Sequence, residues 1–301
     1  MNERIWQTSA LNSSENICPF LGNYQHAIDY EQKALLIACE REDIKAKGDS
    51  LANLGRIYLH LRDWEMAIKF CTQSLSIAVE TNNKNLLINS FHTLAYAHKG
   101  LEQYQKATDF FTEALKIASE IGDKRLQSAI LQALGDVFVE TNQLEEAIEY
   151  NLKSLRVIRQ VGDQFGEAAA LSRIASIYRQ IGSCNKALAY YKESLVILQY
   201  IGAKQSQQQL LLNIGGIYYC ERQYPQAIGF LQSALLLAQE LKNVAEEAKV
   251  LFALGATFHR LSSPLEAISY YRRAYSIYKR LGDEKLAQKM LRMVYQLGAE
   301  F

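Results

Sequence analysis

Apolar and polar residues alternate in residues 131–163 in an order that predicts two helices joined by a short turn. Leu131, Leu134 and Phe138 are separated by three and four residues, which is the helical period. Residues 141–143 are polar and are typical of a turn. Beyond the turn the apolar residues of a second helix are Ala147, Ile148, Leu155 and Ile158.

The same pattern returns every forty residues along most of the chain. One column holds small residues in the first helix of each unit: Gly55, Ala95, Gly135, Ala175, Gly215 and Gly255. A second column is alanine throughout: Ala27, Ala67, Ala107, Ala147, Ala187, Ala227 and Ala267. Small residues where two helices meet allow a close approach of their backbones, so we expect Gly135 to pack against Ala147. A strict period of this kind indicates one helix pair stacked repeatedly.

The register divides the chain into a short irregular segment, a long array and a final helix. Residues 1–22 do not follow the pattern, 23–284 form the array, and 285–301 form a C-terminal capping helix. The array begins with a lone second helix, from Asn23 to about Arg41, and continues with six complete units. Because that helix has no regular partner, we expect residues 1–20 to cover its inner face or two chains to pair there. Asp63, Ser183 and Ser263 are expected to cap second helices.

These residues resemble the tetratricopeptide repeat. Leu131, Leu134, Gly135, Phe138 and Ala147 reproduce its order of apolar and small positions. The family repeat has 34 residues, so this chain is similar to the longer, forty-residue variant of Pins-type adaptors and bacterial peptide-sensing regulators. The resemblance implies an all-α, right-handed superhelical solenoid of antiparallel helix pairs. A coiled coil is disfavoured, because heptads do not divide forty and glycine lies within four of the six first helices.

The resemblance also implies a function, namely a protein- or peptide-binding scaffold that uses the concave groove of the superhelix. One alternative is a regulatory peptide receptor whose ligand changes the superhelix and controls a partner effector. Self-association through the N-terminal end is another. An enzyme is the least favoured reading, because the chain contains no P-loop, no G-x-S-x-G and no H-E-x-x-H.

The composition of the chain limits the kinds of partner and the cellular compartment that we expect for this protein. The 33 basic and 32 acidic residues leave a net charge of +1, which disfavours nucleic acid as a partner. No apolar run is long enough to span a membrane, and the first residues lack the apolar segment of a signal peptide. Five cysteines without paired spacing are typical of reducing cytosol, so we expect a cytoplasmic protein with no metal and no cofactor.

Candidate binding residues lie on the first helices, away from the packing columns, where the family has its groove. They are Asn53, Arg56, His92, Tyr96, Gln132, Asp136, Arg173, Gln180, Leu212, Asn213, Phe252 and Arg260. Amide side chains can bond a peptide backbone, which assigns that role to Asn53 and Asn213. Arginines would select acidic side chains, His92 and Tyr96 would form an aromatic wall, and Leu212 with Phe252 would form an apolar pocket.

Overall fold

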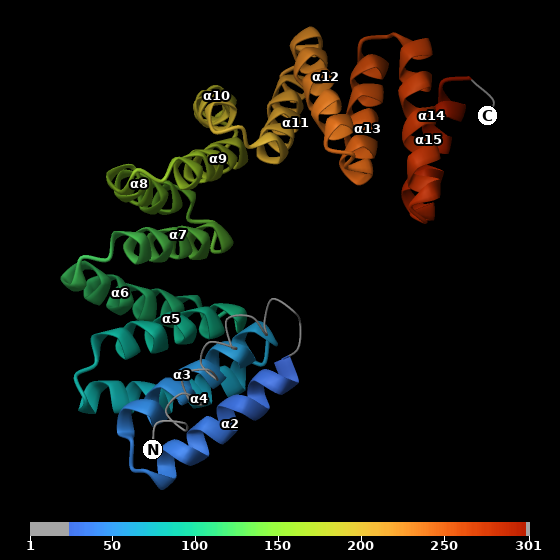
Figure 1. Ribbon diagram of the computed structural model, residues 1–301. Coiled ribbons are helices and arrows are strands. Elements are labelled where there is room, and N and C mark those ends of the chain that lie inside the picture. Colours follow the sequence, from blue (N-terminus) through green and yellow to red (C-terminus); the bar gives the residue numbers. More distant parts are fainter. Residues whose placement is uncertain (1–23, 299–301) are drawn as a thin grey trace. The chain divides into compact units, whose positions relative to one another are not determined.

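The computed structural model describes residues 24–298, and within this range all regular structure is helical (Figure 1). The helices are α2 (Tyr24–Glu40), α3 (Ile44–His60), α4 (Trp64–Glu80), α5 (Lys84–Gly100), α6 (Tyr104–Ile121), α7 (Lys124–Glu140), α8 (Leu144–Val161), α9 (Gln164–Gln180), α10 (Cys184–Tyr200), α11 (Lys204–Cys220), α12 (Tyr224–Glu240), α13 (Val244–Arg260), α14 (Pro264–Arg280) and α15 (Glu284–Gln296).

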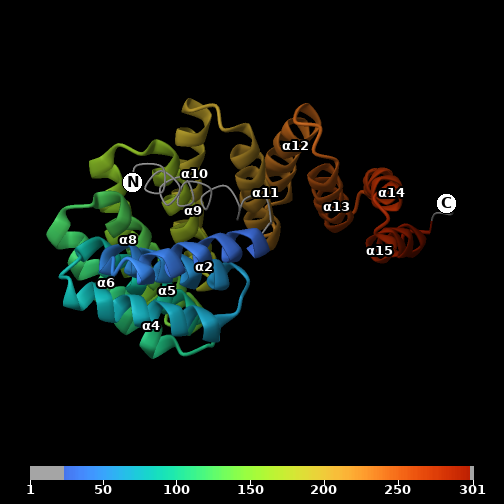
Figure 2. The same ribbon diagram turned by 60° about the horizontal axis from the view of Figure 1, so that its bottom comes forward.

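The chain divides into two compact units, residues 1–161 and 162–301. Unit 1 contains α2 to α8, and unit 2 contains α9 to α15. Within each unit consecutive helices run antiparallel and lie side by side (Figures 1 and 2). The predicted all-α repeat solenoid is therefore confirmed. The prediction for residues 1–20 lies outside the described residues.

Each helix pair is joined by a tight turn with one residue in the left-handed region. Gly122 and Gly162 have φ of 73° and 75°, which a residue without a Cβ adopts without strain. Two or three residues after a helix, a backbone N–H donates to the carbonyl five residues earlier, as from Asp63 to Tyr58 at 3.0 Å and from Asp123 to Ala118 at 3.1 Å. This Schellman geometry satisfies carbonyls that the helix end leaves open. It explains why the Gly-Asp break recurs in the sequence.

The aspartate of that break caps the following first helix. The Asp123 carboxylate accepts from the Leu126 N–H at 3.0 Å, and Asp163 accepts from the Gly166 N–H at 2.9 Å. Among the expected caps of second helices, Asp63 accepts from the Met66 N–H at 3.1 Å. Ser183 and Ser263 make no side-chain cap bond, so that expectation was wrong for the two serines. The effective caps lie mainly between repeats.

The column of small residues in the first helices, which we call the small column, leaves room for a side chain of the second helix to pack directly against the first helix. A Cβ built on Gly135 would lie 2.2 Å from Nδ2 of Asn151 and 3.5 Å from the carbonyl oxygen of Ala147. Close approach at Gly135 is therefore confirmed, but its nearest neighbour is Asn151 and not Ala147. At Gly255 the same space is taken by the ring of Tyr271. The column of Asn151 and Tyr271 thus fills the interior between the two helices of a pair.

Stacked rings join the two helices of every complete unit. His98 lies 5.3 Å from Phe110 with an interplanar angle of 15°, which confirms that this histidine packs between helices. The other pairs are 5.1 to 5.5 Å apart: Tyr58 and Phe70, Phe138 and Tyr150, Tyr178 and Tyr190, Tyr218 and Phe230, and Phe258 and Tyr270. Offset stacking of this kind adds about 0.5–1.5 kcal/mol per pair beyond apolar burial.

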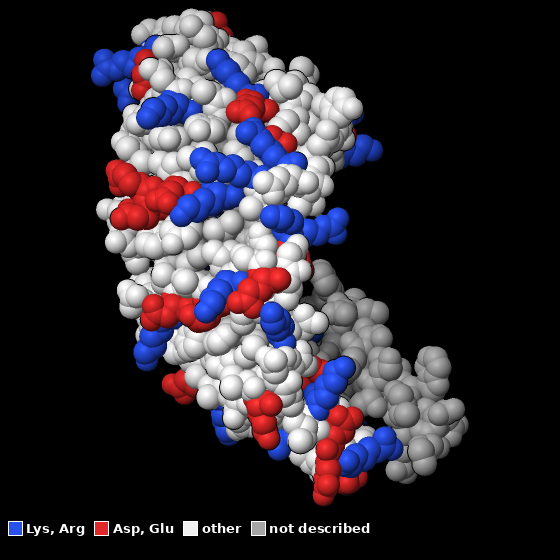
Figure 3. Space-filling model, turned by 90° about the vertical axis from the view of Figure 1, so that its left-hand side faces the viewer, with Lys and Arg blue, Asp and Glu red and all other residues white. Residues whose placement is uncertain are grey.

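Charges are mixed on the surface, and the last helix exposes an aromatic residue. On the face seen in Figure 3, basic and acidic side chains are interleaved along the helices. In α15 Tyr295 occupies the small column and is 54% exposed, because no second helix follows it in the described residues. None of the described helices is long and apolar enough to cross a membrane.

Candidate functional site

The predicted binding residues all lie on first helices, and each unit carries six of them. In unit 1 they are on α3 (Asn53, Arg56), α5 (His92, Tyr96) and α7 (Gln132, Asp136). In unit 2 they are on α9 (Arg173, Gln180), α11 (Leu212, Asn213) and α13 (Phe252, Arg260). Each unit has a cavity among its described helices.

The larger cavity lies in unit 1 and brings three predicted residues together. It has a volume of about 690 Å³, and we name it the α3–α7 cavity after the helices that bound it. Helices α3 and α5 contribute Arg56, His60, His92, Thr93, Tyr96 and Lys99 to its lining. Pockets of roughly 300–1,000 Å³ are the usual size for ligand sites in proteins.

His92 and Tyr96, the two residues predicted to form an aromatic wall, lie together in the lining of this cavity. Their ring centroids are 4.8 Å apart, and Tyr96 packs edge-on against the buried Phe111 at 5.1 Å. Burial lowers the pKa of His92, so its imidazole is neutral at pH 7. His92 therefore offers a hydrogen-bonding group to the cavity and no charge.

Eight residues of the lining were not among the predicted site residues, and three of them are Arg62, Trp64 and Gly100. A Cβ on Gly100 would lie 2.6 to 2.8 Å from atoms of the Trp64 indole, so only glycine allows the ring to lie against the end of α5. The corresponding residues in the other repeats are His60, Glu140, Gln180, Cys220 and Arg260. This lone glycine in a column of larger residues was the sequence signal that could have located the cavity.

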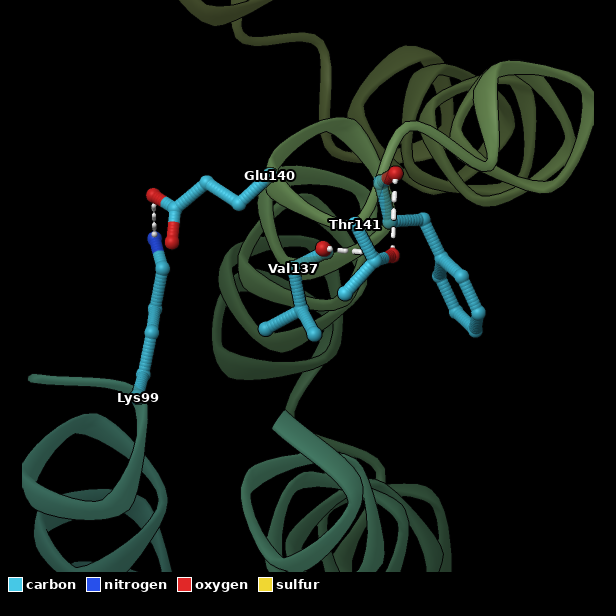
Figure 4. A network of polar contacts seen from close by, with 5 residues as sticks. Lys99, Val137, Glu140 and Thr141 are labelled. Carbon is cyan, nitrogen blue, oxygen red and sulfur yellow. Dashed lines mark hydrogen bonds and ion pairs between the residues drawn. The ribbon is translucent and has the colours of Figure 1, made fainter. Parts of the chain in front are cut away.

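The far end of the cavity is closed by an ion pair between two repeats. Lys99 of α5 extends to Glu140 of α7, with Nζ 3.0 Å from the carboxylate oxygen (Figure 4). The turn that follows Glu140 is held by Thr141, whose hydroxyl donates to the Val137 carbonyl at 3.1 Å. The position of Glu140 is thus fixed by its own helix end.

Asn53, which was predicted to hold a peptide backbone, faces a buried acid. Its Nδ2 donates to Oε1 of Glu31 on α2 at 3.5 Å. Burial raises the pKa of Glu31 to about 7, while the Asn53 bond and the charge of Arg56 lower it by less. Glu31 Oε2 has no hydrogen-bond partner among the described residues. The role of Asn53 in ligand binding stays a prediction, and the structure gives this amide a partner within the protein.

The remaining predicted residues of unit 1 lie outside the α3–α7 cavity. Gln132 and Asp136 are half-buried on α7, and neither belongs to the cavity lining. Asp136 already takes part in an interaction with other residues.

The cavity of unit 2, about 290 Å³ in volume, lies between α9 and α11 and includes Asn213. We name it the α9–α11 cavity; its lining also includes Phe165, Ala168, Ala169, Ser172, Ser206 and Gln209. Small residues create the space, since Ser206 stands where other repeats have the leucines Leu86 and Leu126. Phe165, at the rim, is 57% exposed.

Leu212 and Phe252 do not line either of these two cavities. Phe252 is covered by Lys289, whose Nζ lies 4.5 Å above its ring, and it packs against Tyr271. Phe165, which lies one repeat before Leu212, lines the α9–α11 cavity instead.

The predicted polar residues of unit 2 differ in exposure. Gln180 and Arg260 are exposed at the ends of α9 and α13, and Arg260 donates from Nε to the Tyr219 hydroxyl at 3.3 Å. Arg173 is half-buried and already engaged by other residues. None of the three belongs to the α9–α11 cavity.

No cysteine is among the lining residues of the α3–α7 cavity or the α9–α11 cavity. Cys71 is buried against Gly55, and burial raises the pKa of its thiol to about 12. Within residues 24–298 no three His, Cys, Asp or Glu side chains are grouped as metal ligands.

The MalT-like TPR region matches residues 16–199, and a second tetratricopeptide repeat model matches residues 206–280. Since the first match covers more than half of the sequence, the chain belongs to the MalT-like tetratricopeptide repeat family. No curated protein matches the chain. The resemblance to Pins-type adaptors stays a prediction.

Solved structures share this fold at low sequence identity. BtubC (BKLC) from P. vanneervenii is 21% identical, with a TM-score of 0.63 over 73% of this chain and 92% of that one. The STAND protein PH0952 from Pyrococcus horikoshii, which has a tetratricopeptide repeat sensor, is 17% identical. Its TM-score is 0.77 over 94% of this chain, which spans 44% of that protein. The apo form of RapI is 14% identical, with a TM-score of 0.62 over 92% and 99%.

Proposed function

We propose that this protein is a non-enzymatic scaffold that binds a protein or peptide on the face formed by its first helices. The observation that carries the proposal is the α3–α7 cavity, which lies at three residues selected for their position on that face, Arg56, His92 and Tyr96. At the positions equivalent to Arg56, His92 and Tyr96 the residues change from repeat to repeat, whereas the small and alanine columns keep small residues in every complete unit. Variation on a constant scaffold is what a repeat protein needs to recognise one partner.

The lining of the cavity supports a polypeptide ligand. Aromatic rings such as Tyr96 and Trp64 provide rigid apolar contact area, and charged groups at the rim provide orientation. Because α3, α5 and α7 all contribute, the cavity crosses successive repeats of unit 1. An extended chain matches that course better than a compact ligand does.

The experiment is selection of short linear peptides from a displayed library on the purified full chain, followed by calorimetric titration of the selected peptides. Tyr96→Ala should weaken binding by about tenfold or more, since truncating a central aromatic at an interface costs about 2 kcal/mol. Lys153→Glu, on the exposed side of α8, is the control and should bind within about twofold of the parent. Thermal melting of each variant separates lost binding from lost folding.

Two results would count against the proposal. If the library yields no peptide that binds more tightly than about 100 µM, the protein is not a peptide-binding scaffold. If Lys153→Glu abolishes binding while Tyr96→Ala binds normally, the first-helix face is not the site.

A regulatory peptide receptor would use the same face but respond to its ligand. Solution scattering of the full chain with and without a selected peptide distinguishes the two. A scaffold keeps its radius of gyration, whereas a receptor changes it on saturation.

A further inference from the structure

The charges around the α3–α7 cavity are unequal. Its lining carries three permanent cations, Arg56, Arg62 and Lys99, and one carboxylate, Glu140. Lys99 and Glu140 pair with each other at 3.0 Å. At the end of the cavity formed by α3 and the turn after it lie Arg56, which also interacts with other residues of the protein, and the exposed Arg62.

Nearby titratable groups reduce this positive charge only in part. Glu31, which interacts with Arg56, is buried, and its pKa of about 7 leaves it partly protonated at neutral pH. Burial keeps His92 uncharged at that pH. His60, the other histidine in the lining, is exposed at the end of α3. A negatively charged ligand group is thus favoured beside Arg56 and Arg62.

The lining of the cavity also includes apolar and aromatic side chains. Trp64 is held against Gly100, and Leu59 and Tyr96 line the same space. Apolar and aromatic side chains gain free energy when they leave water for such a surface, about 25 cal/mol per Å² buried. Guanidinium groups bind carboxylates through two parallel hydrogen bonds, which a compact ammonium cannot provide.

We propose that the α3–α7 cavity recognises an acidic residue next to an apolar or aromatic residue in the partner polypeptide. This inference rests on the proposed function and adds the chemistry of the ligand. The acidic side chain pairs with Arg56 and Arg62, and the neighbouring apolar side chain lies on Trp64 and Tyr96. The α9–α11 cavity of unit 2 has no charged residue in its lining, so the acidic preference belongs to unit 1.

The chain contains a matched pair of positions for the test. Arg62 and Arg222 occupy the same position of the turn in different repeats, are both exposed, and have φ of 60° and 59°. Glu102 occupies that turn position in a third repeat with φ of 58°, so glutamate is compatible with the backbone there. Arg62→Glu and Arg222→Glu change the net charge equally, but only Arg62 lines the α3–α7 cavity.

The probes are the peptides selected from the displayed library on the full chain, made synthetically with each Asp or Glu also replaced by Asn or Gln. Selected sequences should be enriched in an acidic residue within about three positions of Phe, Trp, Tyr or Leu. Arg62→Glu should weaken binding by about tenfold, whereas Arg222→Glu should stay within about twofold. Replacing the acidic residue of the peptide should weaken binding to the parent by a similar factor and change little in Arg62→Glu, since the two groups interact directly.

The outcomes separate this inference from the proposed function. Peptides that bind the first-helix face but lack the acidic residue, or bind Arg62→Glu as well as the parent, overturn the inference and leave the scaffold intact. Equal losses in Arg62→Glu and Arg222→Glu also overturn it, because they show a general effect of charge. Arg62→Lys should lose less affinity than Arg62→Glu; if the two lose equally while both melt like the parent, charge pairing at Arg62 is excluded.

Discussion

At the residue scale, one column of second-helix side chains takes different chemistry in each repeat. It holds Glu31, Cys71, Phe111, Asn151, Tyr191, Leu231 and Tyr271. Four of them, Cys71, Asn151, Leu231 and Tyr271, occupy the space that a Cβ on the glycine of their first helix would need. Buried polar atoms without partners among the described residues occur here, at Glu31 Oε2, Asn151 Oδ1 and Tyr271 Oη. An unpaired buried polar group costs about 1–3 kcal/mol. These residues are therefore the places where single substitutions have large effects.

Glu31→Gln should remove a pH dependence of stability. Burial raises the pKa of Glu31 from 4.5 to about 7, so between these values the folded protein binds more protons than the unfolded chain. The free energy of unfolding then falls as the pH rises through this window, and the full loss is present above about pH 7. Both proteins are melted at about pH 5 and about pH 8. The free energy of unfolding of Glu31→Gln relative to the parent should be higher at the higher pH than at the lower pH, by up to about 3 kcal/mol. An equal difference at the two pH values would contradict the assignment.

Substitutions of two glycines inside first helices, Gly135 and Gly216, should change the stability of the protein in opposite directions. Gly135→Leu places atoms where Asn151 lies, and overpacking of this kind lowers the free energy of unfolding by about 1–3 kcal/mol. Gly216→Ala meets nothing within 4 Å, so the variant should gain about 0.5–1 kcal/mol from helix propensity. Urea unfolding of the two variants and the parent measures whether each free energy of unfolding falls or rises. A neutral Gly135→Leu would show that the contact with Asn151 is easily displaced.

At the scale of elements, the turns between repeats carry the capping bonds. Between α6 and α7, Gly122 supplies the left-handed residue and Asp123 the carboxylate that accepts from Leu126. Between α9 and α10, within a repeat, Ser183 makes no such bond. Helix N-termini with a residue suited to capping thus differ in whether that residue makes a capping hydrogen bond.

Asp123→Ala should destabilise the protein more than Ser183→Ala does. Loss of a capping side chain costs about 0.5–2 kcal/mol, while Ser183 has no cap bond to lose. Thermal melting at neutral pH compares the two variants directly. If both melt at the same temperature, the cap of α7 contributes nothing measurable.

At the scale of the whole molecule, each helix packs mainly on its neighbours in sequence, in both units. A solenoid of this kind is stabilised by the sum of its repeats and the interfaces between them. A substitution that destabilises one repeat should therefore lower the local stability of that repeat and of the adjacent repeats only. The two compact units reflect the same locality.

Hydrogen exchange of Gly135→Leu should map this locality. Protection should fall most in α7 and α8, less in α5 and α6, and not measurably in α13 and α14. Mass spectrometry of peptic fragments, compared with the parent at the same pH, gives the profile. Uniform loss across all helices would show that the array unfolds as one cooperative body.

The helices, the turns and the repeat could all be predicted from the order of residues along the chain. These depend on local order: apolar residues at helical spacing, a small residue at each helix contact, and Gly-Asp at a left-handed turn followed by a cap. The same spacing placed Arg56, His92 and Tyr96 on one face of their helices, and the structure brings these three together at one cavity.

Which of those residues share a site depends on packing between repeats. The α3–α7 cavity depends on Trp64 lying against Gly100, and Asn53 is engaged by Glu31 of another helix. Such contacts join residues of neighbouring repeats through the conformations of long side chains, which no period in the sequence encodes. The space at Phe165 likewise exists because small residues from two repeats, Ala168 and Ser206, meet beside it. Local spacing fixes the direction of a side chain, and packing between repeats decides what it meets.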